Sequence, residues 1–186
     1  MASVLTFRRK MTYAELASWP EDGRRYELYD GEVSELPAPL PRHQLAMFEL
    51  GLQLRNYCKA HGGLTLVSPI DIVFDETNVL QPDIVAFTAE RRSLVKIDEA
   101  IRVPPDVAVE VISPSTARND RGRKLIWYER FGVAEYWVFD PVDERIEVRA
   151  RHDENYVVVA TAGRGEVVTS SVLPDFKCAI DSLVQW

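Results

Sequence analysis

The sequence predicts a mixed α/β fold, in which parallel and antiparallel strands share one sheet with a helix on each side. Residues 43–59 have apolar positions at helical spacing, whereas residues 107–112 form the continuous apolar run of a strand buried on both faces. Two later strands, 146–150 and 156–161, follow each other as an antiparallel hairpin would. Where such hairpins are given more weight, the same pattern is classified as α+β.

The first elements are a short helix over residues 12–16 and a hairpin over residues 26–36. Thr12 and Glu15 have the spacing of a capping box at the start of this helix. Asp30-Gly31 lies at the centre of the hairpin and suits a two-residue turn, because both turn residues need positive φ. We therefore expect two tightly paired antiparallel strands near the N-terminus.

A longer amphipathic helix is predicted over residues 43–59, a length of about four turns. The proline-rich stretch 36–41 is expected to form an extended connection into this helix, and Gly62-Gly63 ends it. The expected apolar stripe comprises Leu45, Phe48, Leu52 and Tyr57, widened by Met47, Leu50 and Leu54.

The rest of the chain alternates strands with a second long helix. This helix is expected over residues 117–131, capped by Ser113-Pro114-Ser115-Thr116 and ended by Gly132. The remaining predicted strands cover residues 64–67, 70–74, 83–87 and 136–139.

Length and composition exclude several classes of protein. The 186 residues predict a single domain over 1–186, and the composition excludes wholesale disorder, collagen-like repeats and a disulfide scaffold. The net charge of −7 excludes a protein that coats nucleic acid by bulk charge, but it allows a local basic face. We expect Cys58 and Cys178 to be reduced core thiols. The sequence has neither a membrane-length apolar run nor the charge order of a signal peptide, which predicts a cytoplasmic protein.

Three carboxylates stand inside apolar strands, where a charge is costly to bury unless it is paired or bound to metal. Glu27 lies in the first strand of the hairpin, Asp83 begins an apolar strand, and Glu110 has no charged neighbour within residues 107–112. When Glu110 is taken alone, pairing with an arginine explains it equally well. Together, the three carboxylates favour an oxygen-rich site for Mg²⁺ or Mn²⁺.

A basic segment follows on the second long helix. Residues 118–124 carry four positive charges and one negative charge, a local charge of +3. Lys124 lies about two turns into the helix, so its side chain can reach back to the end of the Glu110 strand. A solvated basic face is the common alternative. Arg121 and Arg123 are the candidate contacts for phosphate.

Six segments carry motifs that are weak singly but specific as an ordered set: Tyr26–Glu32, Pro41–Gln44, Pro82-Asp83, Val109–Thr116, Asp120–Lys124 and Tyr128–Pro141. This set resembles the Uma-two family of restriction-endonuclease-like proteins in the PD-(D/E)XK nuclease superfamily. The resemblance extends from about residue 12 to residue 175.

The resemblance implies a restriction-endonuclease-like core and a Mg²⁺- or Mn²⁺-dependent phosphodiesterase site. Asp83 and Glu110 would bind the metal together with the carbonyl of Val111, and Glu27 would be an outer acidic residue. The superfamily lysine normally stands two residues after the glutamate, where this sequence has Ile112. Lys124 would then supply the amine from the neighbouring helix. His43 or Gln44 would also approach the site. Many nucleases of this superfamily dimerise to cut two strands, so the resemblance also implies a homodimer.

The leading functional hypothesis is a metal-dependent endonuclease that hydrolyses nucleic acid, with DNA as the favoured substrate. Its catalytic residues would be Glu27, Asp83, Glu110 and Lys124. The displaced lysine and the acidic composition motivate an alternative, a catalytically inactive module of the same fold that binds nucleic acid or protein. A phosphatase or nucleotide hydrolase using the same ion is a third possibility. A fold alone does not decide among them.

Overall fold

The structure, a computed structural model, describes residues 9–113 and 116–186. In chain order its elements are α1 (Tyr13–Ala17), β1 (Arg25–Tyr29), β2 (Glu32–Leu36), α2 (Pro41–Ala60), β3 (Leu64–Val67), β4 (Ile72–Asp75), β5 (Asn78–Leu80), β6 (Ile84–Phe87), α3 (Ala89–Arg92), β7 (Val107–Val111), α4 (Ala117–Asn119), a π-helical turn (Asp120–Lys124), α5 (Leu125–Arg130), β8 (Glu135–Asp140), β9 (Arg145–His152), β10 (Asn155–Ala162), β11 (Val167–Thr169), β12 (Lys177–Ala179) and a 3-10 helix (Ile180–Leu183).

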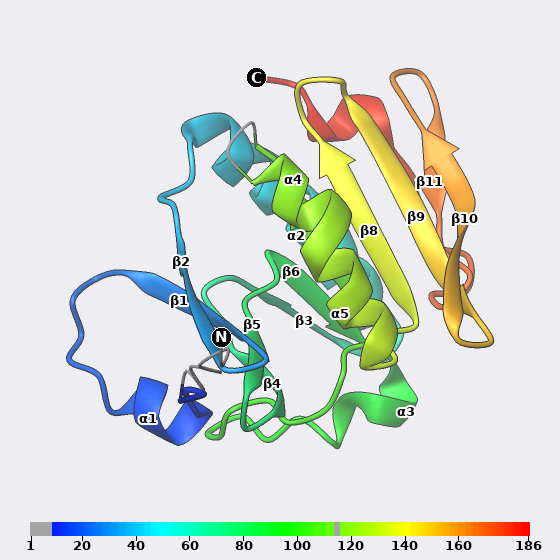
Figure 1. The fold of residues 1–186 in the computed structure, drawn as a ribbon. Coiled ribbons are helices and arrows are strands. Elements are labelled where there is room, and N and C mark those ends of the chain that lie inside the picture. The colour runs from blue at the N-terminus through cyan, green and yellow to red at the C-terminus, as the bar shows by residue number, and fades with distance from the viewer. Residues whose placement is uncertain (1–8, 114–115) are drawn as a thin grey trace, which may run out of the picture.

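A six-stranded mixed sheet forms the centre of the molecule, in the order β10-β9-β8-β7-β6-β3 (Figure 1). The pair β7 and β8 is parallel, and the other neighbouring pairs are antiparallel. The parallel pair is joined through α4, the π-helical turn and α5, because parallel neighbours need a long crossover connection. The predicted mixed α/β fold is confirmed.

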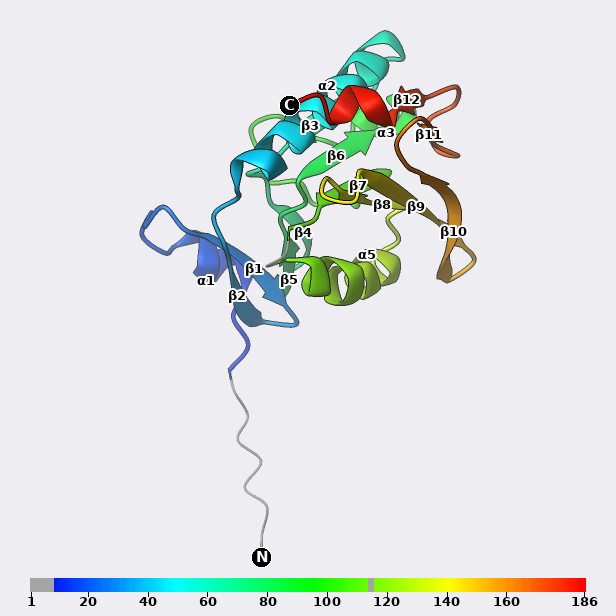
Figure 2. The same ribbon diagram turned by 90° about the horizontal axis from the view of Figure 1, so that it is seen from above.

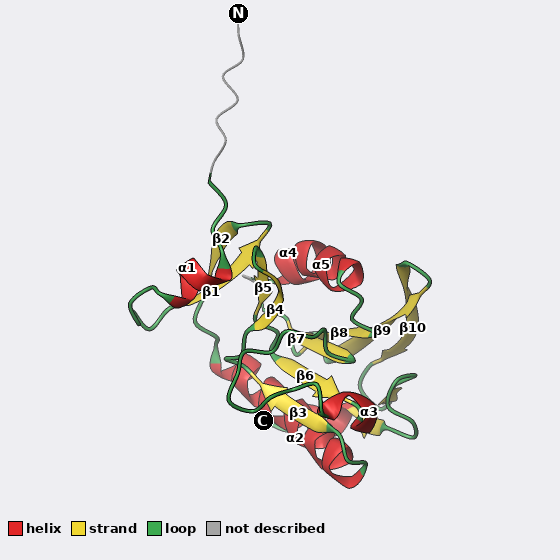
Figure 3. Ribbon diagram, turned by 90° about the horizontal axis from the view of Figure 1, so that it is seen from below, coloured by secondary structure: helices red, strands yellow, loops and turns green. Residues whose placement is uncertain are grey.

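Helices cover both faces of this sheet, as Figures 2 and 3 show from above and below. On one face α2 packs against inward-facing side chains of β6 and β7, including Ile84, Val107 and Val109. On the other face α5 packs through Tyr128 against Ala108 and the strand β8. The alternation of side chains along β7 therefore divides the core into two layers.

The buried face of α2 agrees with the predicted stripe at Met47, Leu50 and Leu54 and differs from it at three other positions. Leu45, Phe48 and Leu52 are exposed by 42%, 64% and 42%, whereas the buried face comprises His43, Ala46, Met47, Leu50, Gly51, Leu54 and Cys58. Both sets have helical spacing, so periodicity alone could not choose between them. The small residues decide the choice, because a Cβ at Gly51 would lie 3.2 Å from the Cγ1 of Val67 on β3. This face lets the helix approach the sheet closely.

A second sheet, in the order β2-β1-β5-β4, stands beside the first. Its hairpin confirms the Asp30-Gly31 turn, with φ of 53° and 80° at the two residues. The capping box of Thr12 and Glu15 is also present. The sequence did not predict β5, and β4 covers Ile72–Asp75 where residues 70–74 were expected.

The second long helix begins at Ala117 and ends at Arg130, with the π-helical turn in its middle. Part of its predicted capping segment, residues 114 and 115, lies outside the described residues. Thr116 makes no capping hydrogen bond with its side chain. A π-helical turn inside a helix commonly marks a functional position, and this one carries Lys124.

The C-terminal segment completes the α2 side of the core. The strands β11 and β12 pair with each other, and the 3-10 helix that follows buries Ile180 and Leu183 against the main cluster. None of these three elements was predicted from the sequence. Cys58 and Cys178 are both buried and free of disulfide, as predicted. Within residues 9–113 and 116–186, every helix is too short or too polar to cross a membrane.

Candidate active site

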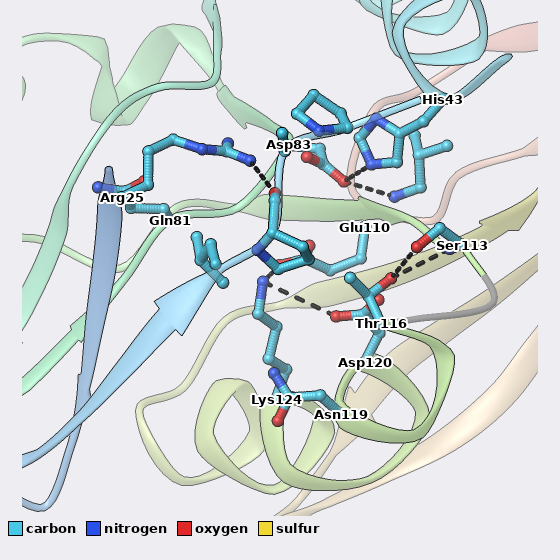
Figure 4. A pocket seen from close by; sticks show the side chains of 15 residues that line it. Arg25, His43, Gln81, Asp83, Glu110, Ser113, Thr116, Asn119, Asp120 and Lys124 are labelled. Atoms are coloured by element: carbon cyan, nitrogen blue, oxygen red, sulfur yellow. Dashed lines mark hydrogen bonds and ion pairs between the residues drawn. The ribbon is translucent and has the colours of Figure 1, made fainter. Parts of the chain in front are cut away.

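The fold brings the four predicted catalytic residues together from distant parts of the chain. Figure 4 shows three of them, Asp83, Glu110 and Lys124. Glu27 comes from β1, Asp83 immediately precedes β6, Glu110 lies on β7, and Lys124 ends the π-helical turn. Asp83, Glu110 and Lys124 line a small cavity of about 40 Å³, and Glu27 contacts Lys124 beside it.

Asp83 and Glu110 are neighbours because β6 and β7 pair with Ile84 opposite Val109. The Oδ2 atom of Asp83 accepts a hydrogen bond of 2.8 Å from the backbone N–H of Val111. It also lies 3.1 Å from Nε2 of His43, which reaches it from the first turn of α2. Asp83 is thus held at one oxygen by two neighbours, and its side chain is 10% exposed.

Lys124 is buried among carboxylates. Its Nζ lies 2.9 Å from Oε1 of Glu110, 3.1 Å from Oε1 of Glu27 and 3.8 Å from Oδ1 of Asp120. Burial alone would lower the pKa of Lys124, but Glu110, Glu27 and Asp120 outweigh it and raise this pKa well above its usual value. Lys124 therefore remains charged inside the site.

Burial acts in the opposite sense on the acids. Loss of solvent raises the pKa of Glu110 well above its usual value, the charge of Lys124 opposes this rise, and repulsion by Asp83 adds to it. The pKa of Asp120 rises to about 6, chiefly through burial and against the attraction of Lys124. The site thus concentrates carboxyl groups whose charged forms need a cation.

Tyrosines fix two of these carboxylates in place. The Tyr128 hydroxyl donates a hydrogen bond of 2.7 Å to Oε1 of Glu110, and the Tyr29 hydroxyl donates one of 2.7 Å to Oε2 of Glu27. The backbone N–H of Gln81 donates to Oε1 of Glu27 at 2.8 Å. Both oxygens of Glu27 therefore have donors, which makes Glu27 the least available of the three acids to any ligand.

The matching family model spans residues 13–181, nearly the whole chain, and is described as "Putative restriction endonuclease". The chain belongs to the Uma2 family. The resemblance found in the sequence motifs is thereby confirmed. A crystal structure titled as a putative nuclease belonging to DUF820, from Anabaena variabilis ATCC 29413, is similar with a TM-score of 0.78 and 19% identity. The match covers 95% of this chain and 98% of the other, and it shows a shared fold. No curated protein matches the sequence.

The oxygen atoms around the cavity of this Uma2 protein fit a hard cation only in part. Among the described residues, no three His, Cys, Asp or Glu side chains converge as a complete metal-binding group. However, no hydrogen bond within residues 9–113 and 116–186 reaches Oδ1 of Asp83 or Oε2 of Glu110. Mg²⁺ commonly binds one or two carboxylates and keeps several waters. These two oxygens, with a backbone carbonyl of Val111, a residue that also lines the cavity, therefore make a chemically suitable set.

The structure also shows which further residues lie at the site. His43 reaches the site, whereas Gln44 is exposed and does not line the cavity. Gln81 and Asp120 were omitted, although Asp120 stands one helical turn before Lys124 on the same face. Ile112, at the usual lysine position, is 4% exposed and packs in the hydrophobic cluster with Tyr128.

The two arginines expected to contact phosphate already have acidic partners. Arg121 forms an ion pair of 3.2 Å with Asp140, and Arg123 forms one of 2.8 Å with Glu32. Neither lines the cavity that contains Asp83 and Glu110. The charge run made these residues prominent in the sequence, but folding directs their side chains to carboxylates outside that cavity.

Proposed function

We propose that this Uma2 protein is a metal-dependent endonuclease that hydrolyses phosphodiester bonds of nucleic acid, with DNA as the favoured substrate. One observation carries the proposal: two buried carboxylates, Asp83 and Glu110, each have an oxygen without a hydrogen bond from the described residues, and a charged lysine lies at the same cavity. Family membership supports nucleolytic chemistry.

In this proposal Asp83 and Glu110 would hold Mg²⁺ or Mn²⁺, together with the carbonyl of Val111. The ion would polarise a phosphoryl oxygen and lower the pKa of a bound water. His43 and the Val111 N–H fix one oxygen of Asp83, while no hydrogen bond from the described residues reaches the other. Lys124, kept charged by Glu27 and Glu110, would stabilise negative charge developing on the phosphate.

The test is cleavage of duplex, single-stranded and branched DNA with Mg²⁺ or Mn²⁺, by the natural protein and by Asp83→Ala. We expect the substitution to reduce cleavage by about 10³-fold, as removal of a central electrostatic group commonly does. Asp71→Asn is a matched control, because Asp71 is a half-buried carboxyl with a hydrogen bond from Gln81 and does not line the cavity. Equal cleavage by Asp83→Ala and the natural protein would contradict the proposal.

The inactive binding module remains the second candidate, because a complete metal-binding group of three side chains is absent from the described residues and Lys124 already neutralises two acids. Calorimetric titration with Mn²⁺ separates the two candidates. The endonuclease requires binding of the ion, and Asp83→Ala should abolish it. DNA binding without cleavage, and without uptake of Mn²⁺ at millimolar concentration, would favour the module.

A further inference from the structure

The cavity has a second positively charged group, Arg25, whose partners are all uncharged. Its guanidinium donates one hydrogen bond of 2.9 Å to the Ser68 hydroxyl and another of 3.1 Å to the Pro37 carbonyl. Within residues 9–113 and 116–186, no carboxylate lies within ion-pair distance of Arg25. Figure 4 shows its side chain extending toward the carboxylates from the side opposite His43.

This arrangement distinguishes Arg25 from the other cations near the site. Lys124 is 3% exposed and already contacts Glu27 and Glu110. Arg121 and Arg123 are paired with carboxylates away from the cavity. Arg25 is partly exposed, lines the cavity and holds only neutral acceptors. An anion entering the cavity would therefore meet Arg25 without first having to break an ion pair.

The Pro37 carbonyl belongs to the segment 37–40, which connects β2 to α2 and borders the cavity through Pro37, Ala38 and Pro39. Proline has no N–H to donate, so half of this segment cannot make backbone hydrogen bonds as a donor. The two hydrogen bonds of Arg25 link this segment to Ser68. The cavity is small, about 40 Å³, so movement of the segment that borders it would widen it.

We propose that Arg25 binds a phosphate of the nucleic acid and that this contact releases segment 37–40 from the rim of the cavity. The proposal rests on the proposed function and names the residue that recognises its substrate. A phosphate is an anion and accepts two parallel hydrogen bonds from a guanidinium, whereas the Pro37 carbonyl is a neutral acceptor of one. A phosphate therefore displaces the Pro37 carbonyl from Arg25, and the segment loses its tie to the rim.

The experiment measures binding of a fluorescent DNA duplex in EDTA, which prevents turnover, over a series of salt concentrations. We expect Arg25→Ala to weaken binding about tenfold, since loss of a charged hydrogen bond has an effect of this size. The plot of log affinity against log salt concentration should also become less steep, by about the amount that one phosphate contact contributes. Arg25→Lys should keep the slope but not the full affinity, because lysine lacks the planar fork.

Arg24→Ala is the matched control. Arg24 is the preceding residue, is more exposed, and is held by Asp22 and Glu35 outside the cavity. It should leave the affinity and the salt slope unchanged. Thermal unfolding of each variant verifies the fold, and Arg25→Lys serves as the decisive variant if Arg25→Ala unfolds. The inference would be overturned if the folded Arg25 variants kept both the affinity and the salt slope of the natural protein. It would also be overturned if the natural protein failed to bind DNA.

A spin label on segment 37–40 tests the second half of the proposal. Attached at Ala38→Cys, an exposed position, the label should become more mobile when the duplex binds to the otherwise natural protein, and it should already be mobile in Arg25→Ala without DNA. Unchanged or lower mobility on binding would overturn release of the segment. The outcomes separate the two proposals: DNA binding through Arg25 without cleavage would sustain this inference and reject the endonuclease, whereas cleavage independent of Arg25 would do the reverse.

Discussion

Glu110 and Glu135 are both fully buried carboxylates on adjacent parallel strands, yet their surroundings differ completely. The register of β7 and β8 places Val107 opposite Glu135 and Glu110 opposite Val138, so the two acids face opposite sides of the sheet. Glu135 accepts four hydrogen bonds from uncharged donors: Nε1 of Trp137, Oγ of Ser170, and the N–H and Oγ of Ser171. Each of its oxygens has two donors.

Glu110, in contrast, receives its contacts at one oxygen. Oε1 lies near Lys124 and accepts from Tyr128, while the other oxygen has no hydrogen bond from the described residues and the side chain borders a cavity. A buried acid with every lone pair satisfied by neutral donors has a structural role, because it locks the segments that supply the donors. An acid that pairs with a buried cation, and that has one oxygen without a hydrogen bond, can still bind a ligand.

The largest expected effect concerns the activity of Glu110→Gln. Cleavage should fall by about 10³-fold or more, because the site loses a charge that binds the ion. The free energy of unfolding should change by less than about 1 kcal/mol, because Lys124 keeps Glu27 and Asp120 beside it and is not left as an uncompensated buried charge. Lys124 would still have Glu27 at 3.1 Å. Cleavage rates and urea unfolding measure the two effects, and a large loss of stability would make Glu110 a second structural acid.

Glu135→Ala should show the reverse pattern. It removes the acceptor of four buried or half-buried donors, which should lower the free energy of unfolding by about 3 kcal/mol. Cleavage per folded molecule should stay within about twofold of the natural rate, a change below about 0.4 kcal/mol. Ser171→Ala is the milder companion variant, because it removes one hydroxyl donor and leaves the backbone N–H bond. A loss of cleavage without a loss of stability would contradict the structural role of Glu135.

The sequence singled out Glu110 because a charged residue stands inside a continuous apolar strand. Glu135 was not singled out, since it begins a strand, where an acidic residue is unremarkable. Its burial depends on Ser170 and Ser171, more than thirty residues away in sequence. The strands β11 and β12 and the final 3-10 helix were not predicted because they are short. Elements of three or four residues show too little periodicity to detect.

Local features were predictable where one segment determined its own structure. The Asp30-Gly31 turn and the capping box needed only neighbouring residues. The buried face of α2 was not predictable in this way, because the helix carries apolar residues on two sides and the sheet selects the side with Gly51. Arg25 was likewise missed, since its position at the cavity follows from the hairpin and from Ser68, which lie far apart in sequence.

The smallest expected effect concerns a third carboxylate, Asp140, at the end of the strand that begins with Glu135. Asp140 accepts hydrogen bonds from the backbone N–H groups of Val142 and Asp143 and pairs with Arg121, whose side chain is 50% exposed. Arg121→Gln should change the free energy of unfolding by less than about 0.5 kcal/mol, because solvent screens exposed ion pairs. DNA affinity should change less than in Arg25→Ala, because Arg121 lies outside the cavity. Urea unfolding and duplex binding measure both quantities. A loss of affinity equal to that of Arg25→Ala would return Arg121 to the role that the charge run suggested, and it would show that position at the cavity does not decide which arginine binds phosphate.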